Sequence, residues 1–155
     1  MHNMNEWCNR LIMHEGLKLT PYYCSAGKLT IGVGRNLEDN PLSNEERLAL
    51  GDYMHGITEN GAKMLLRNDI INCYNNVKRI VKNFEELSPD RQYALVDMCF
   101  QLGIKGLKKF KRMLRAIEKN NFYMAAFECI SSEYAKQTPN RAKKIALTIK
   151  TGTWG

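Results

Sequence analysis

One short segment, residues 17–36, has the pattern of β-strands in a sequence whose periodicity is otherwise helical. A turn, Ser25-Ala26-Gly27, separates two groups of strand-forming residues: Tyr22 and Tyr23 before it, and Leu29, Thr30, Ile31 and Val33 after it. Aromatic and β-branched residues on both sides of a glycine-containing turn are typical of a β-hairpin. We therefore predict a hairpin over residues 17–36, with a short third strand near Ile57.

Helix signals account for the rest of the chain. Apolar residues recur every three or four positions; Ser43, Thr58 and Ser88 are capping residues before such runs, and Gly16 and Gly51 follow them. The expected helices cover approximately residues 3–14, 43–51, 59–81, 88–102, 107–119, 122–130 and 138–150. The 155-residue chain is thus expected to be a mostly helical α+β protein.

The order of these elements predicts two lobes within a single domain. At about 150 residues per domain, the length indicates one domain. We expect an N-terminal α+β lobe over residues 1–58, whose first helix packs on the other lobe, a connecting helix over residues 59–81 and a helical lobe over residues 82–155. A cleft between the lobes would hold a ligand.

Positive charge is concentrated in the second half of the chain. Residues 1–77 hold 7 Lys+Arg and 9 Asp+Glu, a net charge of −2, whereas residues 78–155 hold 16 and 7, a net charge of +9. Seven basic residues between positions 105 and 119 accompany one acid, Glu118. Such a surface attracts nucleic acid, anionic membrane or acidic cell-wall polymer, or it is a solvated helix face, and charge alone does not distinguish these.

Several classes of protein are disfavoured. The longest uncharged apolar runs, such as residues 11–13 and 94–96, are far shorter than the roughly 18 residues of a membrane span. The N-terminus carries Glu6 where a secretory signal would be apolar, so we expect synthesis in the cytoplasm. The 5 cysteines form no Cys-x-x-Cys pair, which argues against a disulfide scaffold and a zinc site.

Neither a nucleotide-binding loop nor a metal site is expected. Gly32-Val33-Gly34 lacks the later glycine and the Lys-Ser/Thr of the nucleotide motifs, so these glycines more simply serve strand bends or close packing. The three histidines, His2, His14 and His55, share no ligand spacing. We predict that the protein uses no cofactor and no metal.

Glu15 is the best candidate for chemistry by its position. It ends the first predicted helix, directly before Gly16, and the hairpin with Cys24 and Thr30 follows at once. A carboxylic acid at such a junction can be partly removed from water, which lets it keep a proton and donate it near neutral pH. The alternative is an exposed surface residue, as most glutamates at helix ends are.

Three stretches of the chain resemble the T-even-type phage lysozymes, a muramidase family. In the first, residues 14–34, Glu15, Cys24 and Thr30 match the family spacing of Glu, eight residues, Asp or Cys, five residues, Thr. Cys-Phe-Gln-Leu-Gly at 99–103 resembles a cleft-lining segment, and residues 137–154 resemble the C-terminal helix and closing segment. The resemblance implies a lysozyme-like fold over essentially the whole chain.

The resemblance also implies a reaction, the inverting hydrolysis of the β-1,4 bond between N-acetylmuramic acid and N-acetylglucosamine in peptidoglycan. Glu15 would be the general acid, Cys24 would stand for the second catalytic group and Thr30 would hold the attacking water. The two catalytic groups would be roughly 6.5–9.5 Å apart, so that the water fits between them. The residues that it assigns to the cleft or its support are Gln101, Tyr134, which stands where Trp is common, Gln137, Asn140 and Arg141, which would approach Glu15.

Two departures from the family pattern concern chemistry and packing. Cys24 replaces the usual Asp and could act as a thiolate base, position the water or leave most of the work to Thr30; an inert thiol packed in the hairpin is the alternative. Arg35 replaces a histidine whose acidic partner corresponds to Asp69. We therefore expect an Arg35–Asp69 ion pair with a structural role. His14 stands where the family often has an acid.

The resemblance finally implies a setting. An endolysin of this kind is monomeric, is made in the host cytoplasm, passes to the wall after a holin opens the membrane, and acts on peptidoglycan glycan strands to lyse the cell. Two other classes stay open. One is a noncatalytic cationic protein that binds wall or membrane through residues 105–119. The other is a nucleic-acid-binding protein, for which no recognised motif is present.

Overall fold

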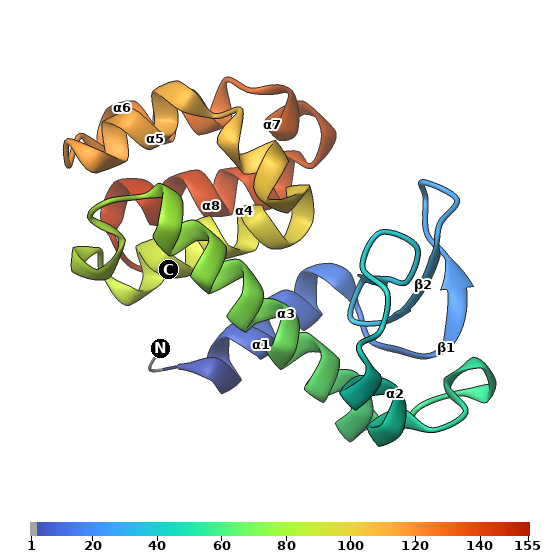
Figure 1. Cartoon of the computed structure of the whole chain (residues 1–155). Helices are drawn as coiled ribbons and strands as arrows, with labels where there is room; N and C mark the ends of the chain where they lie inside the picture. The colour runs from blue at the N-terminus through green and yellow to red at the C-terminus, as the bar shows by residue number, and fades with distance from the viewer. Residues whose placement is uncertain (1–2) are drawn as a thin grey trace. The chain divides into compact units, whose positions relative to one another are not determined.

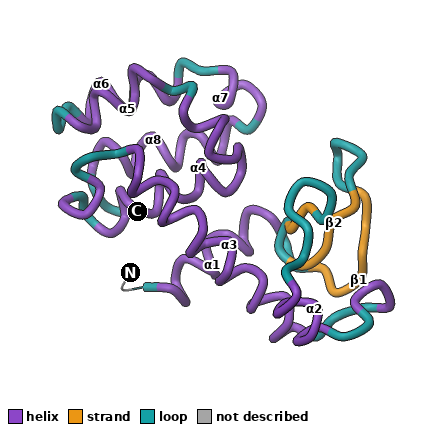
Figure 2. Tube along the Cα trace, viewed as in Figure 1, coloured by secondary structure: helices purple, strands orange, loops and turns teal. Residues whose placement is uncertain are grey.

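A computed structural model describes residues 3–155, and its elements form a mostly helical chain with a small antiparallel sheet (Figures 1 and 2). The elements are α1 (Met4–Glu15), β1 (Lys18–Tyr23), β2 (Leu29–Gly32), β3 (Arg35–Asn36), α2 (Asn44–Leu50), α3 (Glu59–Ile80), α4 (Pro89–Lys108), α5 (Lys111–Glu118), α6 (Phe122–Ile130), α7 (Glu133–Gln137) and α8 (Pro139–Thr151). Two short 3-10 turns, Tyr53–His55 and Phe84–Glu86, precede α3 and α4. The α+β class predicted from the sequence is confirmed.

The described chain divides into two compact units, residues 3–70 and residues 71–155. The division falls inside α3, so the first half of this helix belongs to one unit and its last turns to the other. No helix in residues 3–155 combines the length and the apolar character that a membrane crossing requires.

The sheet in the first unit has the strand order β1-β2-β3, with both pairs antiparallel. The predicted hairpin is present, but the prediction of a third strand near Ile57 is wrong, since β3 is Arg35–Asn36, directly after the turn at Gly34. Ile57 makes one strand-like hydrogen bond, from its N–H to the carbonyl of Leu19 (2.8 Å). It cannot extend the pairing because the chain enters α3 two residues later.

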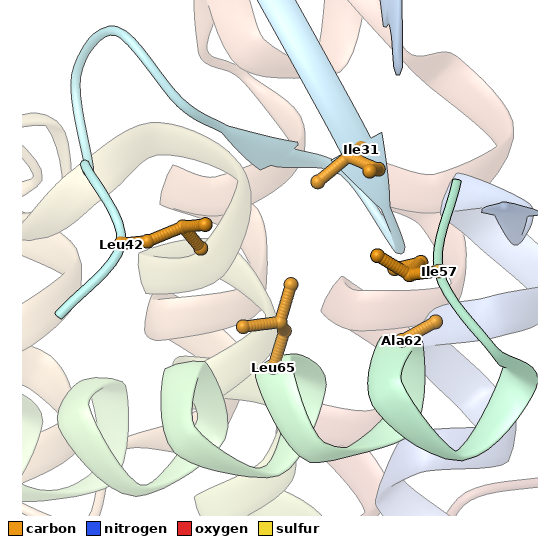
Figure 3. Close-up of a cluster of buried hydrophobic side chains, with 5 residues drawn as sticks. All are labelled: Ile31, Leu42, Ile57, Ala62 and Leu65. Carbon is orange, nitrogen blue, oxygen red and sulfur yellow. The ribbon is translucent and has the colours of Figure 1, made fainter. Parts of the chain in front are cut away.

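A small apolar core holds the sheet against α3. Ile31 of β2, Leu42 and Ile57 of the connecting loops, and Ala62 and Leu65 of α3 are buried and converge on one another (Figure 3). Burial of each such side chain contributes about 1.5–3 kcal/mol to stability. The core therefore fixes the position of β2, which carries Thr30.

The second unit is a cluster of helices around α4. Residues 93–99 of α4 are buried without interruption, and α8 packs against α4 and α6. The predicted break at Gly103 is present as a residue with φ of +75° inside the helix, which continues to Lys108. The helix predicted from residue 107 begins later, at Lys111, and α7 was not expected from the sequence.

Candidate active site

Glu15 is the last residue of α1, and its carboxylate lies against the backbone of Gly34. Gly16 ends the helix at this point with φ of +77°, and its N–H donates to the carbonyl of Ile12 (2.7 Å). Gly34 has φ of +67°, and a Cβ atom at this position would lie 2.9 Å from Glu15 Oε1. The missing side chain of Gly34 therefore leaves the space that the carboxylate occupies.

Cys24 follows β1 directly and sits at the start of the hairpin turn. Its N–H donates to the carbonyl of Lys28 (3.0 Å), and its carbonyl accepts from the N–H of Gly27 (2.8 Å). Hydrogen bonds from the backbone of Lys28 and of Ala26 lower the pKa of the Cys24 thiol below its usual value. More of this thiol is therefore ionised at neutral pH than in an ordinary cysteine.

Thr30 and Tyr22 face each other across β1 and β2, and both belong to the neighbourhood of Glu15 and Cys24. Thr30 is buried, and its hydroxyl donates to the carbonyl of Lys28 (2.9 Å), which leaves the lone pairs of Oγ1 able to accept a hydrogen bond from water. Burial, followed by the negative charges of Glu15 and Cys24, raises the pKa of Tyr22. A neutral phenol thus lies within electrostatic reach of both acids.

A buried ion network supports the turn next to these residues. Arg35 binds Glu46 through two hydrogen bonds (Nη2–Oε1 2.7 Å, Nη1–Oε2 3.1 Å), and its Nη1 also lies 3.2 Å from Asp69 Oδ1. The second contact is the ion pair that the sequence analysis expects. The principal partner of Arg35 is nevertheless Glu46. The sequence indicates Glu46 only as part of a capping box with Ser43, whereas in the structure Glu46 both caps α2 and binds Arg35.

One guanidinium in this network balances two carboxylates, and their acidities diverge. Burial acts to raise the pKa of Glu46, but hydrogen bonds from Arg35, from Asn68 and from the N–H of Ser43 outweigh it and hold the pKa at about 2. Burial raises the pKa of Asp69 to about 6 against the opposing charge of Arg35, and the charge of Glu46 adds to the rise. Asp69 is therefore the carboxylate that takes up a proton first.

We expect the stability advantage of the wild type over Asp69→Asn to fall as pH rises from 4 to 7. The pKa of Asp69 is raised from 3.8 to about 6, so its protonated form stabilises the folded state below pH 4, and this contribution is lost as pH rises through 6. Between pH 4 and pH 7, the difference in the free energy of unfolding between the wild type and Asp69→Asn should shrink by on the order of 2–3 kcal/mol. Urea unfolding of both proteins at several pH values measures it, and a difference that does not vary with pH would contradict the assignment.

In the second unit, Arg141 of α8 is held by a buried acid of α4. Asp97 is fully buried; its Oδ1 accepts from Arg141 Nε (2.8 Å) and its Oδ2 from the hydroxyl of Tyr93 (2.7 Å). A carboxylate this deeply buried is stable only with such partners. The Asp97 side chain therefore fixes the direction of the Arg141 guanidinium.

The other residues predicted for the cleft lie on α4, α7 and α8. Tyr134 and Gln137 line a pocket of about 650 Å³ together with Phe110, whose ring meets that of Tyr134 edge to face at 6.1 Å. Gln101 Nε2 donates to the hydroxyl of Thr138 (3.2 Å), and Asn140 is exposed at the start of α8. Burial raises the pKa of Tyr134, which keeps its hydroxyl protonated.

Four residues of these sites have no signal in the sequence that assigns them there, or only an indirect one. Asp97 could have been found, because it is the only acid in the apolar run of residues 93–102 and a buried acid needs a cation. Tyr22 looked like a strand former and Glu46 like a capping residue. The contact of Gly34 with a carboxylate 19 positions earlier has no local signal in the sequence.

The structure offers no ligand set for a metal within residues 3–155, where no three of His, Cys, Asp or Glu gather suitably. His2 lies outside the described residues. No disulfide joins the five cysteines of the described chain, Cys8, Cys24, Cys73, Cys99 and Cys129.

Comparison with known proteins shows one family. A model of the family described as phage lysozyme matches residues 13–146. The chain is 31% identical over 153 residues to "Probable T4-type lysozyme 2" of Dictyostelium discoideum, and 32% identical over 156 residues to "Probable T4-type lysozyme 1" of the same organism; each match covers 90% of both chains. It is also 28% identical to the "Pre-baseplate central spike protein Gp5" of Enterobacteria phage T4, of which the match covers 26%.

Proposed function

The chain belongs to the phage lysozyme family, and from that premise we propose that this lysozyme hydrolyses the β-1,4 bond between N-acetylmuramic acid and N-acetylglucosamine in bacterial peptidoglycan. One observation carries the assignment of the catalytic groups. The charges of Glu15 and Cys24 both act on the phenol of Tyr22, which is paired across the sheet with Thr30. This supports a site in which the acid, the thiol and the hydroxyl act together around Tyr22.

Glu15 is the proton donor in this proposal. Its protonated carboxyl gives a proton to the glycosidic oxygen as the bond from that oxygen to the anomeric carbon breaks. The close approach of Gly34 supports this role, because the backbone holds the carboxyl in one place before the substrate arrives.

Cys24 and Thr30 act on the attacking water. The lone pairs of Thr30 Oγ1 accept a hydrogen bond from the water, and the Cys24 thiolate takes its proton as the oxygen bonds to the anomeric carbon. Attack on the face opposite the leaving group inverts the configuration of that carbon. The lowered pKa of Cys24 supports this role, because it raises the fraction of thiolate that is available to take the proton.

The residues of the second unit bind and orient the substrate. The pocket lined by Phe110, Tyr134 and Gln137 offers an aromatic wall and an amide, which suit the apolar faces and the hydroxyl or acetamido groups of a sugar. Asp97 keeps Arg141 directed, so that the guanidinium is available as a fixed cation. Gln101 and Asn140 complete the polar groups that we assign to substrate binding.

A panel of variants at position 24 tests the role of the thiol. We expect Cys24→Ala to lower kcat on purified peptidoglycan about 100-fold, because the base for the water is lost, whereas Cys24→Asp restores a carboxylate base and retains most of the rate. Thr30→Ala should lower kcat on its own. If Cys24→Ala keeps the full rate, the thiol is not the base and Thr30 is the main group that holds the water.

We expect Gly34→Ala to lower kcat about tenfold or more, because the new methyl group must displace the Glu15 carboxylate. The matched control is Gly51→Ala, where φ is +69° but nothing lies within 4 Å of an added Cβ atom. Both variants place an alanine at a positive φ, so both should lose stability in thermal unfolding. An equal effect on kcat in the two variants would show that the contact with Glu15 is irrelevant to catalysis.

The biological role that fits this activity is that of an endolysin, released to the wall through a holin pore and lysing the cell as a monomer. We expect expression in a bacterial cytoplasm to lyse the culture only when a pore-forming protein is expressed with it. Glu15→Gln should not lyse the cells under either condition, and lysis by this variant would mean that another activity is responsible.

A further inference from the structure

The outward face of α6 consists of apolar side chains alone. Tyr123 (74% exposed), Phe127 (61%), Met124 (49%) and Ile130 (40%) cover it, while Ala125, Ala126 and Cys129 on the opposite face are buried. Scattered exposed apolar residues are ordinary, but four large ones on a helix of nine residues form a continuous patch. We call these four residues the α6 patch.

Basic residues border the α6 patch on the neighbouring helix α8. Lys150 Nζ lies 5.0 Å from the ring centroid of Tyr123. Leu147 and Lys143 lie one and two turns before Lys150 on the same exposed face of α8, and Leu147 is 52% exposed. Lys150 therefore stands beside the α6 patch, and its exposed face continues with a further apolar side chain and a second lysine.

A second neighbour of α6, the helix α5, adds more positive charge. α5 packs against α6, and the acid Glu128 of α6 is paired with Arg112 of α5 (3.9 Å). The exposed basic residues of α5 are Lys111, Arg112 and Arg115, and Lys119 directly after the helix is exposed as well. The second unit as a whole, residues 71–155, carries a net charge of +9.

We propose that the α6 patch and its basic border bind the surface of an anionic lipid bilayer. A helix that lies in the bilayer interface buries apolar and aromatic side chains below the headgroups while lysines and arginines contact anionic headgroups. A purely polyanionic partner would account for the charge but not for the exposed Phe127, Met124 and Ile130. A second copy of the chain is disfavoured, because four side chains fall short of the about 20–30 residues per side of a stable interface and the two surfaces would repel.

Vesicle binding tests the proposal. We expect the wild type to bind phosphatidylcholine vesicles that contain phosphatidylglycerol, and to bind pure phosphatidylcholine much more weakly. The double variant Tyr123→Ser and Phe127→Ser should lower the partition coefficient about tenfold or more, since two aromatic side chains no longer insert. Lys143→Gln with Lys150→Gln should weaken binding to the anionic vesicles and leave binding to neutral ones unchanged.

The matched control is Leu48→Ser, which removes an even more exposed apolar side chain (86%) from α2 and should leave binding unchanged. Thermal unfolding and hydrolysis of soluble peptidoglycan fragments should be unaltered in all these variants, which separates this proposal from the proposed catalytic function. Absence of wild-type binding to anionic vesicles, or unchanged binding by the double variant, would overturn the proposal. A dimer in sedimentation that Phe127→Ser abolishes would assign the α6 patch to a second copy instead.

Discussion

Replacement of Glu15 by Gln should lower kcat on purified peptidoglycan by about 1,000-fold or more. The amide has the size of the carboxyl group but cannot protonate the departing oxygen, and general acid catalysis contributes about 100- to 10,000-fold. Binding should persist, because the polar residues of the second unit are untouched. Release of new reducing ends measures the rate, and co-sedimentation with insoluble peptidoglycan measures the binding.

Glu6→Gln is the matched control for this variant. Glu6 lies on the same helix, and its exposed ion pair with Arg10 (3.4 Å) contributes little. Its kcat should equal that of the wild type. A Glu15→Gln protein within tenfold of the wild-type rate would remove Glu15 from the mechanism, whereas loss of both rate and binding would indicate a noncatalytic role for this residue.

Replacement of Arg35 by Met should lower the free energy of unfolding by about 3–5 kcal/mol, because the Glu46 carboxylate would remain buried without a cation and Asp69 would lose its charged partner. The apolar side chain fills most of the vacated volume, so the loss reports on charge more than on packing. Urea unfolding measures it. Adding Glu46→Gln and Asp69→Asn to Arg35→Met should recover part of the loss, because the uncompensated charges are then gone.

Lys28→Met tests whether burial of the ion pair is the cause of the expected loss in stability. Lys28 forms an ion pair with Asp39 in the same unit at 2.7 Å, the same distance as in the Arg35–Glu46 pair. The side chains of Lys28 and Asp39 are, however, both exposed. We expect this variant to lose about 1 kcal/mol or less. Equal losses in the Arg35 and Lys28 variants would show that the buried network has no special weight in stability.

The sequence predicted best what depends on neighbouring positions. Glu15 at a helix end, the hairpin that bears Cys24 and Thr30, and the capping box at Ser43 all follow from patterns within about ten residues. The misplaced third strand shows the limit of such patterns. Ile57 is a residue type that favours strands, but the third strand is the segment that the turn at Gly34 directs back along β2, which is Arg35–Asn36.

Contacts between distant positions could be predicted only in part. Asp97 and Arg141 are 44 positions apart, and no local pattern relates them. A lone acid in an apolar helix indicates only that a cation lies near it in the fold. The sequence resemblance led to Asp69 as the partner of Arg35 but not to Glu46. One cation with two buried acids is a tertiary arrangement, and it sets the divergent pKa values of the two carboxylates.

The sugar at the new chain ends distinguishes the proposed cleavage from the alternatives. Purified peptidoglycan is digested with the wild-type protein while NMR follows the anomer that forms first. In a separate sample the ends are reduced with borohydride to identify the sugar that carries them. The account predicts reducing N-acetylmuramic acid that appears first as the α anomer, the product of inversion at a β-linkage. Reducing N-acetylglucosamine, anhydro-muramic ends, or no new reducing ends would contradict it.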